Sequence, residues 1–364
     1  MSDQLQASNF GSQCPIPITD YPVITLAHGG GGRLTQMLID RMFVPAFGPQ
    51  PGGGHDGAML TLPNPATTGA DQGEFRLAFS TDSFVVSPRF FPGGDIGSLA
   101  VHGTINDLAM CGARPVALSV AFILEEGLPM DELWRVVSSL ARAAREAGVS
   151  VVTGDTKVVE RGKGDGLYIN TSGIGVIPPG IAIAPSRARP GDLVLINGPI
   201  AQHGIAIMSV REGLAFETTI ESDSAPLYDL VSGVLAAAGE QVHVLRDPTR
   251  GGLSSTLNEI AGQAKVGIRL NESSIPINEE VRGACEILGL DPLYVANEGK
   301  CLVIVARAAG ETVLSALRSH PLGRESAIIG ELVADHPGRV VMRSRIGGQR
   351  IVDMLSGEQL PRIC

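Results

Sequence analysis

Three aspartates, Asp82, Asp107 and Asp155, stand where apolar runs end in turns rich in glycine or threonine. Carboxylates at such edges can hold Mg²⁺ while the ion bridges phosphate oxygens. A single aspartate at a turn more often caps a helix or the turn itself, because its side chain accepts hydrogen bonds from backbone N–H groups. The three together predict a magnesium site that serves a nucleotide. The alternative is that each aspartate is structural.

A run of four glycines, Gly29, Gly30, Gly31 and Gly32, separates a short apolar run from apolar residues at helical spacing. Glycines between a strand and a helix let backbone N–H groups approach an anion closely. No Gly-Lys-Ser/Thr sequence follows, so this is not a Walker A loop. The run predicts a phosphate-binding loop, with a plain flexible loop as the alternative.

Lys157 and Glu298 could carry out chemistry on such a nucleotide. Lys157 lies two residues after Asp155, with Thr156 between them, so on an extended segment the outer two side chains point the same way. Its ammonium could meet a phosphate or polarise a substrate oxygen. Glu298 follows the apolar run 293–297, where partial burial would raise its pKa toward neutrality and suit a general base. A solvated lysine and a turn glutamate are the alternatives.

The segment of Asp247, Thr249 and Arg250 joins an expected strand to an expected helix and is followed by two glycines. Its backbone N–H groups and the Arg250 guanidinium could bind an anion or the substrate. A plain loop is the alternative interpretation.

The last residue of the sequence is a cysteine, Cys364. Chain ends are exposed and mobile unless something fixes them, so we expect an accessible thiol with a pKa near its ordinary value of about 8.5. Ten extended residues reach roughly 33 Å. A tail over residues 346–364 could therefore carry the thiol into a site on its own chain or on a neighbouring chain. A frayed tail without a role is the alternative.

The composition limits the classes of protein to consider. The 364 residues predict two domains, because single cores rarely grow beyond about 250–300 residues. The net charge of −10 argues against nucleic acid as a partner and means that a polyanionic substrate needs metal ions or local cations. Five cysteines without zinc-type spacing indicate reduced thiols in the cytoplasm. We expect neither a signal peptide nor a membrane span.

Hydrophobic periodicity predicts the elements that position these residues, and their irregular alternation predicts an α+β fold. Helices are expected at 97–110, 129–147, 202–213, 224–237, 252–264, 277–288 and 310–319. Strands are expected at 76–80, 115–124, 149–152, 167–176, 193–196, 241–246, 267–270, 293–297, 301–306, 326–333 and 338–342. Turn formers divide the chain into a loosely ordered extension over 1–22, a domain over 23–185, a second domain over 186–345 and the mobile tail.

Longer motifs carry a resemblance to a known family. Residues 107–115 match the Asp-x4-Gly-Ala-x-Pro signature of the aminoimidazole-ribotide-synthetase (PurM-like) superfamily. Within it, residues 122–130, 152–159 and the ending 361–364 resemble the HypE family of hydrogenase maturation factors. The ending is the most specific of these motifs, and the resemblance extends over about residues 23–364.

The resemblance implies a two-domain PurM-like architecture, with an N-terminal dimerising mixed sheet and a C-terminal α+β sandwich. It implies ATP and Mg²⁺ as cofactors, and it implies that the chain forms a homodimer. It also implies that the carbamoyltransferase HypF loads a carbamoyl group onto Cys364, and that ATP-dependent dehydration turns this thiocarboxamide into a thiocyanate. The cyanide then passes to iron on a HypC–HypD scaffold, for the centre of [NiFe]-hydrogenase.

On this hypothesis Cys364 is the carrier thiol, the three aspartates hold Mg²⁺, the glycine run closes over the phosphates, Lys157 stabilises charge and Glu298 takes protons. Two alternatives stay open. The first is another enzyme of the superfamily, of the selenophosphate synthetase or thiamine-phosphate kinase type. The former usually has a cysteine or selenocysteine in the glycine-rich loop, which has none here, and the latter leaves the terminal thiol unexplained. The second is a non-catalytic ATP-binding scaffold.

Overall fold

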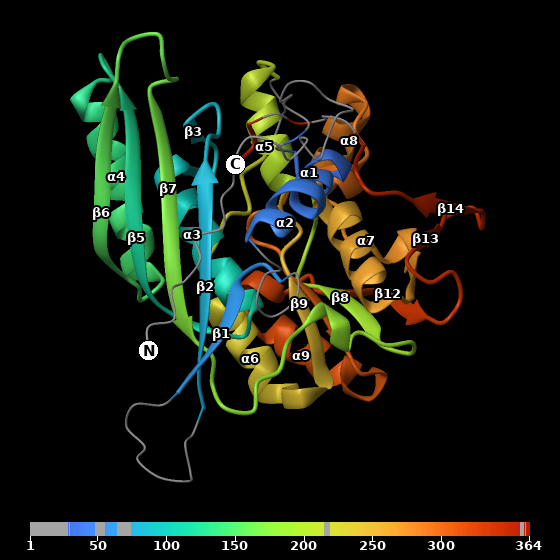
Figure 1. Cartoon of the computed structure of the whole chain (residues 1–364). Helices are drawn as coiled ribbons and strands as arrows, with labels where there is room; N and C mark the ends of the chain where they lie inside the picture. Colours follow the sequence, from blue (N-terminus) through green and yellow to red (C-terminus); the bar gives the residue numbers. More distant parts are fainter. Residues whose placement is uncertain are drawn as a thin grey trace, which may run out of the picture.

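The described chain contains two large sheets, each packed against helices, which meet at a junction (Figure 1), and a small third sheet of β3 (Phe90–Phe91) and β4 (Gly94–Asp95). The computed structural model describes residues 28, 30–47, 55–63, 74–214, 219–356, 360 and 362–364. The expected extension over residues 1–22 lies outside this part, as does Gly29. The predicted two-domain α+β architecture is confirmed.

The first sheet has five strands, and only its β5–β6 pair is parallel. In spatial order the strands are β1 (Ala58–Pro63), β2 (Glu74–Phe84), β7 (Leu167–Val176), β5 (Arg114–Glu125) and β6 (Ser150–Val159). Helices α3 (Ile96–Met110) and α4 (Met130–Glu146) pack on one face of this sheet, where their apolar side chains form a core with β2, β5 and β7.

Helix α3 is the buried centre of the molecule. The Asp95 side chain starts it by accepting the N–H groups of Gly97 and Ser98 at 2.7 and 3.1 Å. Gly112, with φ +71°, follows its last turn. Thirteen of its 15 residues are buried, because α3 packs against the first sheet on one side and against the second domain on the other. The helix thereby brings Asp107 to the junction of the domains.

The second sheet has seven strands, in the order β14-β13-β10-β12-β8-β11-β9. Their bounds are β8 (Leu193–Ile196), β9 (Val242–Arg246), β10 (Gly267–Asn271), β11 (Leu302–Val305), β12 (Ala327–Val333), β13 (Val340–Arg343) and β14 (Gln349–Val352). One face packs against α5 (Gln202–Arg211), α7 (Gly252–Ala264) and α8 (Glu279–Leu288). The other packs against α6 (Tyr228–Ala238) and α9 (Gly310–Ser319). Helices therefore cover both faces of this sheet. The bounds before β1 are α1 (Arg33–Leu38), the π-helical turn Ile39–Phe43 and α2 (Val44–Phe47).

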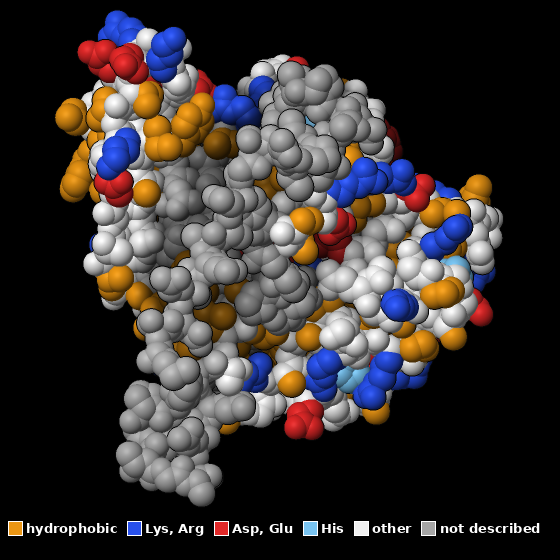
Figure 2. Space-filling model, viewed as in Figure 1, with side chains coloured by type: hydrophobic (Ala, Val, Ile, Leu, Met, Phe, Trp, Pro, Cys, Tyr) orange, Lys and Arg blue, Asp and Glu red, His pale blue; other side chains and the backbone are white. Residues whose placement is uncertain are grey.

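Among the described residues, no helix covers the second face of the first sheet, and large apolar side chains are exposed on it. Side chains alternate along its strands, so residues that point away from α3 and α4 point outward. The exposed large apolar side chains on this face include Leu60, Leu62, Phe79, Val116, Ile123 and Ile174. Figure 2 shows hydrophobic side chains gathered over this region, at the left of the view. A contiguous apolar patch of this kind marks an interaction surface.

Three local expectations are wrong. Strand β6 continues to Val159, because β-branched residues extend it, so Asp155 and Lys157 lie within an edge strand and not in a turn. Residues 293–297 contain a 3₁₀ turn and no strand, since the Asp291 side chain accepts the Leu293 N–H at 3.0 Å. The tail expected to be mobile from residue 346 begins with β14, which pairs with β13.

Candidate active site

The end of the C-terminal tail is docked into its own chain, at the junction of the two domains (Figure 1). Cys364 is only 6% exposed. The N–H of Val85, just after β2, donates to a main-chain carboxylate oxygen of Cys364 at 3.0 Å. The expected exposed thiol is therefore wrong for this conformation, because backbone hydrogen bonds fix the terminus. Of the two expected destinations, the tail here enters the site of its own chain.

Arg362 anchors the tail from both directions. Its carbonyl oxygen accepts the Ser87 N–H at 3.2 Å and the Arg211 guanidinium at 2.9 Å. Its own guanidinium donates to the Val85 carbonyl at 2.9 Å and pairs with Asp165 at 2.5 Å. These partners come from both domains, so docking the tail also joins the two domains.

His203 on α5 binds the backbone carbonyl of Ile363 in the tail. Its Nε2 lies 2.8 Å from the Ile363 carbonyl oxygen, and its Nδ1 lies 2.8 Å from the Ser222 hydroxyl. A carbonyl only accepts, so Nε2 carries the proton and Nδ1 accepts from the hydroxyl. Complete burial lowers the pKa of His203, which keeps the ring in this neutral tautomer. The tail is thus held by a neutral histidine.

The terminal thiol faces the Arg250 guanidinium. Arg250 Nε donates to Cys364 Sγ at 3.1 Å. Burial raises the pKa of the Cys364 thiol to about 12, while the charge of Arg250 opposes the rise and the carboxylates of Glu298 and Asp82 add to it. A thiol with this pKa is protonated near neutral pH, so the docked sulfur is a poor nucleophile.

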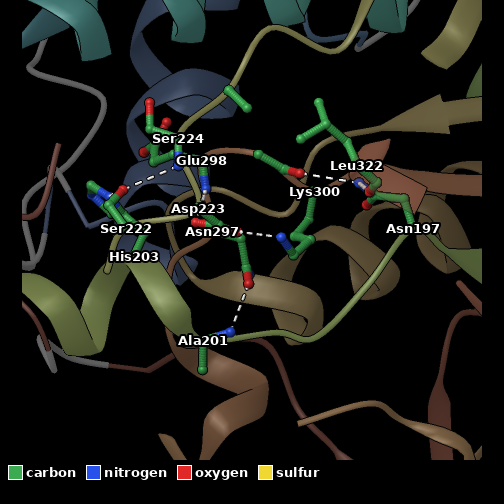
Figure 3. A network of polar contacts seen from close by, with 12 residues as sticks. Asn197, Ala201, His203, Ser222, Asp223, Ser224, Asn297, Glu298, Lys300 and Leu322 are labelled. Atoms are coloured by element: carbon green, nitrogen blue, oxygen red, sulfur yellow. Dashed lines mark hydrogen bonds and ion pairs between the residues drawn. The ribbon is translucent and has the colours of Figure 1, made fainter. Parts of the chain in front are cut away.

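Glu298 is fixed by hydrogen bonds to its backbone. Its N–H donates to the Asp223 carboxylate at 3.1 Å, and its carbonyl accepts from the Asn106 side chain on α3 at 3.2 Å. The neighbouring Asn297 accepts the Ala201 N–H at 2.7 Å (Figure 3). These hydrogen bonds fix the backbone of residues 297 and 298 in an irregular segment, in place of the expected strand pairing.

The Glu298 side chain is buried, with 3% of the residue exposed. Its Oε1 has no hydrogen-bond partner among the described residues. Burial raises the pKa of Glu298 well above its ordinary value, and the carboxylates of Asp82, Asp247 and Asp223 add to the rise. An orphaned buried carboxyl group beside a docked thiol indicates a position where a ligand or substrate belongs.

Four aspartates extend the acidic surroundings toward α3. Asp107 accepts the Ser80 hydroxyl at 2.5 Å, and burial, followed by the charges of Asp247, Asp56 and Asp82, raises its pKa well above the ordinary value. Burial is also the first cause that raises the pKa of Asp247, to about 6. The nearby cations are Arg250 and Arg246, and Arg246 pairs with Asp56 at 2.5 Å. Carboxylates outnumber cations here.

The donor set fits Mg²⁺ that is bound together with a nucleotide. Within the described ranges, no three or more His, Cys, Asp or Glu side chains are placed to hold an ion by themselves. Mg²⁺ usually takes one or two protein carboxylates and fills its octahedron with water and phosphate oxygens. The mutually repelling carboxylates of Asp82, Asp107 and Asp247 suit this arrangement.

Asp155, Thr156 and Lys157 lie elsewhere in the same chain. Asp82 on β2 and Gly154 on β6 occupy the same rung of the sheet, with β7 and β5 between them. Three strand spacings of about 4.8 Å place them roughly 14 Å apart. Asp155 and Lys157 are mostly exposed and pair with each other at 2.6 Å. One chain therefore cannot hold one ion with both Asp82 and Asp155, and the expected three-aspartate set is wrong within a single chain.

Two family models match this chain: "AIR synthase related protein, N-terminal domain" over residues 54–177 and "AIR synthase related protein, C-terminal domain" over residues 189–343. Carbamoyl dehydratase HypE of Cupriavidus necator is 56% identical over 341 residues, which are 94% of this chain and 95% of the relative. The chain belongs to the carbamoyl dehydratase HypE family. The predicted family and enzyme class are thereby confirmed.

Solved structures of the HypE family have the same fold. The structure of HypE in complex with ATP is 50% identical, with a TM-score of 0.77, and the match covers 94% of this chain and 100% of that one. HypE in the HypE–HypF complex is 45% identical, with a TM-score of 0.79 and coverage of 87% and 99%. No described helix of this HypE-family chain is long and apolar enough to cross a membrane.

The described part of the glycine run packs against this site of the HypE-family chain. A Cβ on Gly31 would lie 2.9 Å from the Arg250 Cβ, and Gly31 has φ +69°. A Cβ on Gly32 would lie 2.4 Å from the Leu355 carbonyl oxygen, which accepts the Arg33 N–H at 3.1 Å. Only glycine permits these approaches. The run thus lies between the segment of Asp247, Thr249 and Arg250 and the base of the tail.

Three residues of the site were missed by the sequence reasoning: Asp56, His203 and Asp223. Asp56 precedes strand β1, whereas the three selected aspartates were chosen where apolar runs end, so that rule did not select it. His203 and Asp223 stand alone in the sequence, and their roles come from contacts with the tail and with Glu298. No spacing signal marks either of them.

Proposed function

We propose that this chain is an ATP-dependent carbamoyl dehydratase, which converts a thiocarboxamide on Cys364 into a thiocyanate. The observation that carries the proposal is the docked tail, which places the terminal thiol beside Arg250 and Glu298. An amide oxygen is a poor leaving group. Transfer of the γ-phosphoryl group of ATP to that oxygen makes it leave as phosphate, while a base removes the N–H protons and the nitrile forms.

Glu298 is the proposed base, and Arg250 the proposed partner of the carbamoyl group. Without ligands, burial and the neighbouring carboxylates raise the pKa of Glu298 well above its ordinary value, which favours the protonated form. Two groups that raise it are Asp82 and Asp247. These two aspartates would hold Mg²⁺ that is bound with ATP, and the ion would supply positive charge there. Glu298 would then become a carboxylate only when the site is loaded, which restricts proton removal to the productive complex.

Loading of the tail requires a different conformation from the docked one. A buried thiol with a pKa of about 12 is unreactive, so we propose that Cys364 receives its carbamoyl group while the tail is undocked. The carbamoyltransferase HypF is the proposed donor, supported by the HypE–HypF complex of a relative. A HypC–HypD scaffold in the cytoplasm is the proposed acceptor of the cyanide, for [NiFe]-hydrogenase.

A second copy of the chain is the proposed partner for the open apolar face of the first sheet. Asp155 and Lys157 lie on β6, at the edge of that face, and no third charged group is paired with them among the described residues. Covering the face would bury them beside the second copy. The proposed roles of Lys157 in charge stabilisation and of Asp155 and Thr156 in nucleotide binding therefore rest on a homodimer, in which they serve the partner's site.

The proposal is tested by phosphate release from Mg-ATP in the presence of HypF and carbamoyl phosphate. Cys364→Ala should bind ATP as the native chain does but lose the phosphate release that depends on carbamoyl supply. Cys285→Ala, which changes a buried thiol on α8, should retain it. Cyanide production by Cys364→Ala would overturn the proposal. ATP binding without any ATP-dependent change at Cys364 would support the non-catalytic scaffold.

A further inference from the structure

A second cavity, of about 370 Å³, lies on the far side of the segment that carries Glu298. Its walls come from residues 197–199, 222–225, 321–322 and 324–325, together with Gln202 and Lys300. Figure 3 shows Asp223 and Lys300 side by side between Asn197 and Ser222. The volume is within the range of about 300–1,000 Å³ typical of small-molecule sites. The proposed reaction uses none of these side chains as reacting groups.

Lys300 places a nearly buried cation in this cavity. Its side chain is 9% exposed, and its Nζ lies 3.1 Å from Asp223 Oδ2. An ammonium has three donors, and Asp223 is the one partner that Lys300 has in the described part of the chain. Two N–H groups of Lys300 are thus available to a ligand. Asp223 Oδ1 accepts the Glu298 N–H, whereas Asp223 Oδ2 forms only the ion pair with Lys300 and has no hydrogen-bond partner among the described residues.

Two further donors of the cavity come from Gln202 and Arg324. Gln202 and Arg324 line it, and neither side chain has a partner within the described ranges. The Ser222 hydroxyl is bonded to His203. Glu325 is the opposing group, and it is exposed at the rim. An ammonium, a guanidinium and an amide around one cavity form the donor set that binds phosphate or carboxylate oxygens.

We propose that this cavity is a second binding site, for a small oxyanion held by Lys300, Arg324 and Gln202. The site is separate from the acidic crevice beside Cys364, which is formed by Asp82, Asp107, Asp247 and Glu298, and it has its own cations. It shares one wall with that crevice, because Asp223 accepts the Glu298 N–H and Ser222 bonds to His203, which holds the tail. The wall is tight: a Cβ on Gly299 would lie 1.8 Å from the Asp223 carbonyl oxygen.

Titration calorimetry of the full chain with inorganic phosphate tests this site without requiring activity. Lys300→Met should weaken phosphate binding by about tenfold or more, since it removes a charge-assisted hydrogen bond. Arg324→Gln should weaken it by a smaller factor, about threefold. Arg339→Gln, an exposed arginine elsewhere, is the matched control and should bind phosphate like the native chain.

Arg250→Met distinguishes phosphate binding in this cavity from binding beside Cys364. Because Arg250 does not line the cavity, the variant should leave the cavity's affinity for phosphate unchanged. Lys300→Met leaves Asp223 buried without its partner, so the double variant Lys300→Met/Asp223→Asn and the exposed Arg324→Gln guard against loss of folding. Unchanged phosphate affinity in Arg324→Gln and in a folded Lys300 variant would overturn the proposal. No binding to the native chain, or binding lost only in Arg250→Met, would also overturn it.

Discussion

The crevice beside Cys364 and the exposed edge strand β6 both carry an acidic side chain near a basic one, but the pKa of the acid is raised in the crevice and lowered on β6. In the crevice, burial raises the pKa of Glu298, whose Oε1 has no partner in the described part of the chain. On β6, a hydrogen bond from Lys157, followed by one from the Thr156 N–H, lowers the pKa of Asp155. The Glu298 carboxyl group is therefore unsatisfied, whereas the pair on β6 is already satisfied. The Asp155–Lys157 pair would lose its exposure to solvent only if another surface covered β6.

The largest expected effect comes from removing the base in the crevice. Glu298→Gln keeps the size and the backbone bonds of residue 298 but cannot accept a proton, so thiocyanate formation should fall by about 10²–10⁴-fold. Rapid-quench assays of the carbamoylated chain measure this. Glu325→Gln, which neutralises an exposed glutamate, is the matched control and should form thiocyanate at the native rate. Native rates in Glu298→Gln would remove Glu298 from the mechanism.

Release of the tail gives the next effect. His203→Ala removes the donor to the Ile363 carbonyl, a hydrogen bond worth about 1 kcal/mol, so the undocked fraction should rise about fivefold. Alkylation of Cys364 by iodoacetamide, followed by mass spectrometry of the C-terminal peptide, should accelerate by that factor. His320→Ala, which removes a histidine that bonds only near its own turn, should leave the rate unchanged. Equal rates in both variants would mean that His203 does not hold the tail.

A mixed dimer tests whether β6 serves the partner's crevice. Lys157→Met and Glu298→Gln each inactivate every site in their own homodimers on this account. Random mixing of the two should restore about one quarter of native activity, because half of the dimers are mixed and each has one intact site. Activity that stays at the level of the separate variants would show that Lys157 works within its own chain or not at all.

The smallest effect is on stability against pH. Burial raises the pKa of Asp247 to about 6 from an ordinary value near 4, so the folded state without ligands binds more protons than the unfolded state between these values. The free energy of unfolding should therefore fall by about 1–3 kcal/mol as the pH rises through this window. Urea unfolding at a series of pH values measures it. Asp247→Asn should flatten the dependence of the unfolding free energy on pH. An unchanged slope in this variant would show that other groups cause the dependence.

Much of the fold could be predicted because its signals are local. Apolar stripes and flanking glycines predict α4 and α3, and β7 has the bounds that its alternation predicts. Arg250 and Glu298 could be selected because each follows an apolar run at a turn. The separation of Asp82 from Asp155 could not be predicted, since it depends on strand order. The burial of Cys364 could not be either, because backbone bonds to Val85 and Ser87 dock the tail without a side-chain pattern.

The mass of the C-terminal peptide tests the central claim most directly. The chain would be incubated with HypF, carbamoyl phosphate and either Mg-ATP or, after loading, a non-hydrolysable ATP analogue. The account predicts a carbamoyl group on Cys364 in both cases and the loss of one water from it only with hydrolysable ATP. A carbamoylated Cys364 that never loses water with Mg-ATP, or an unmodified Cys364 in a folded chain that binds ATP, would contradict it.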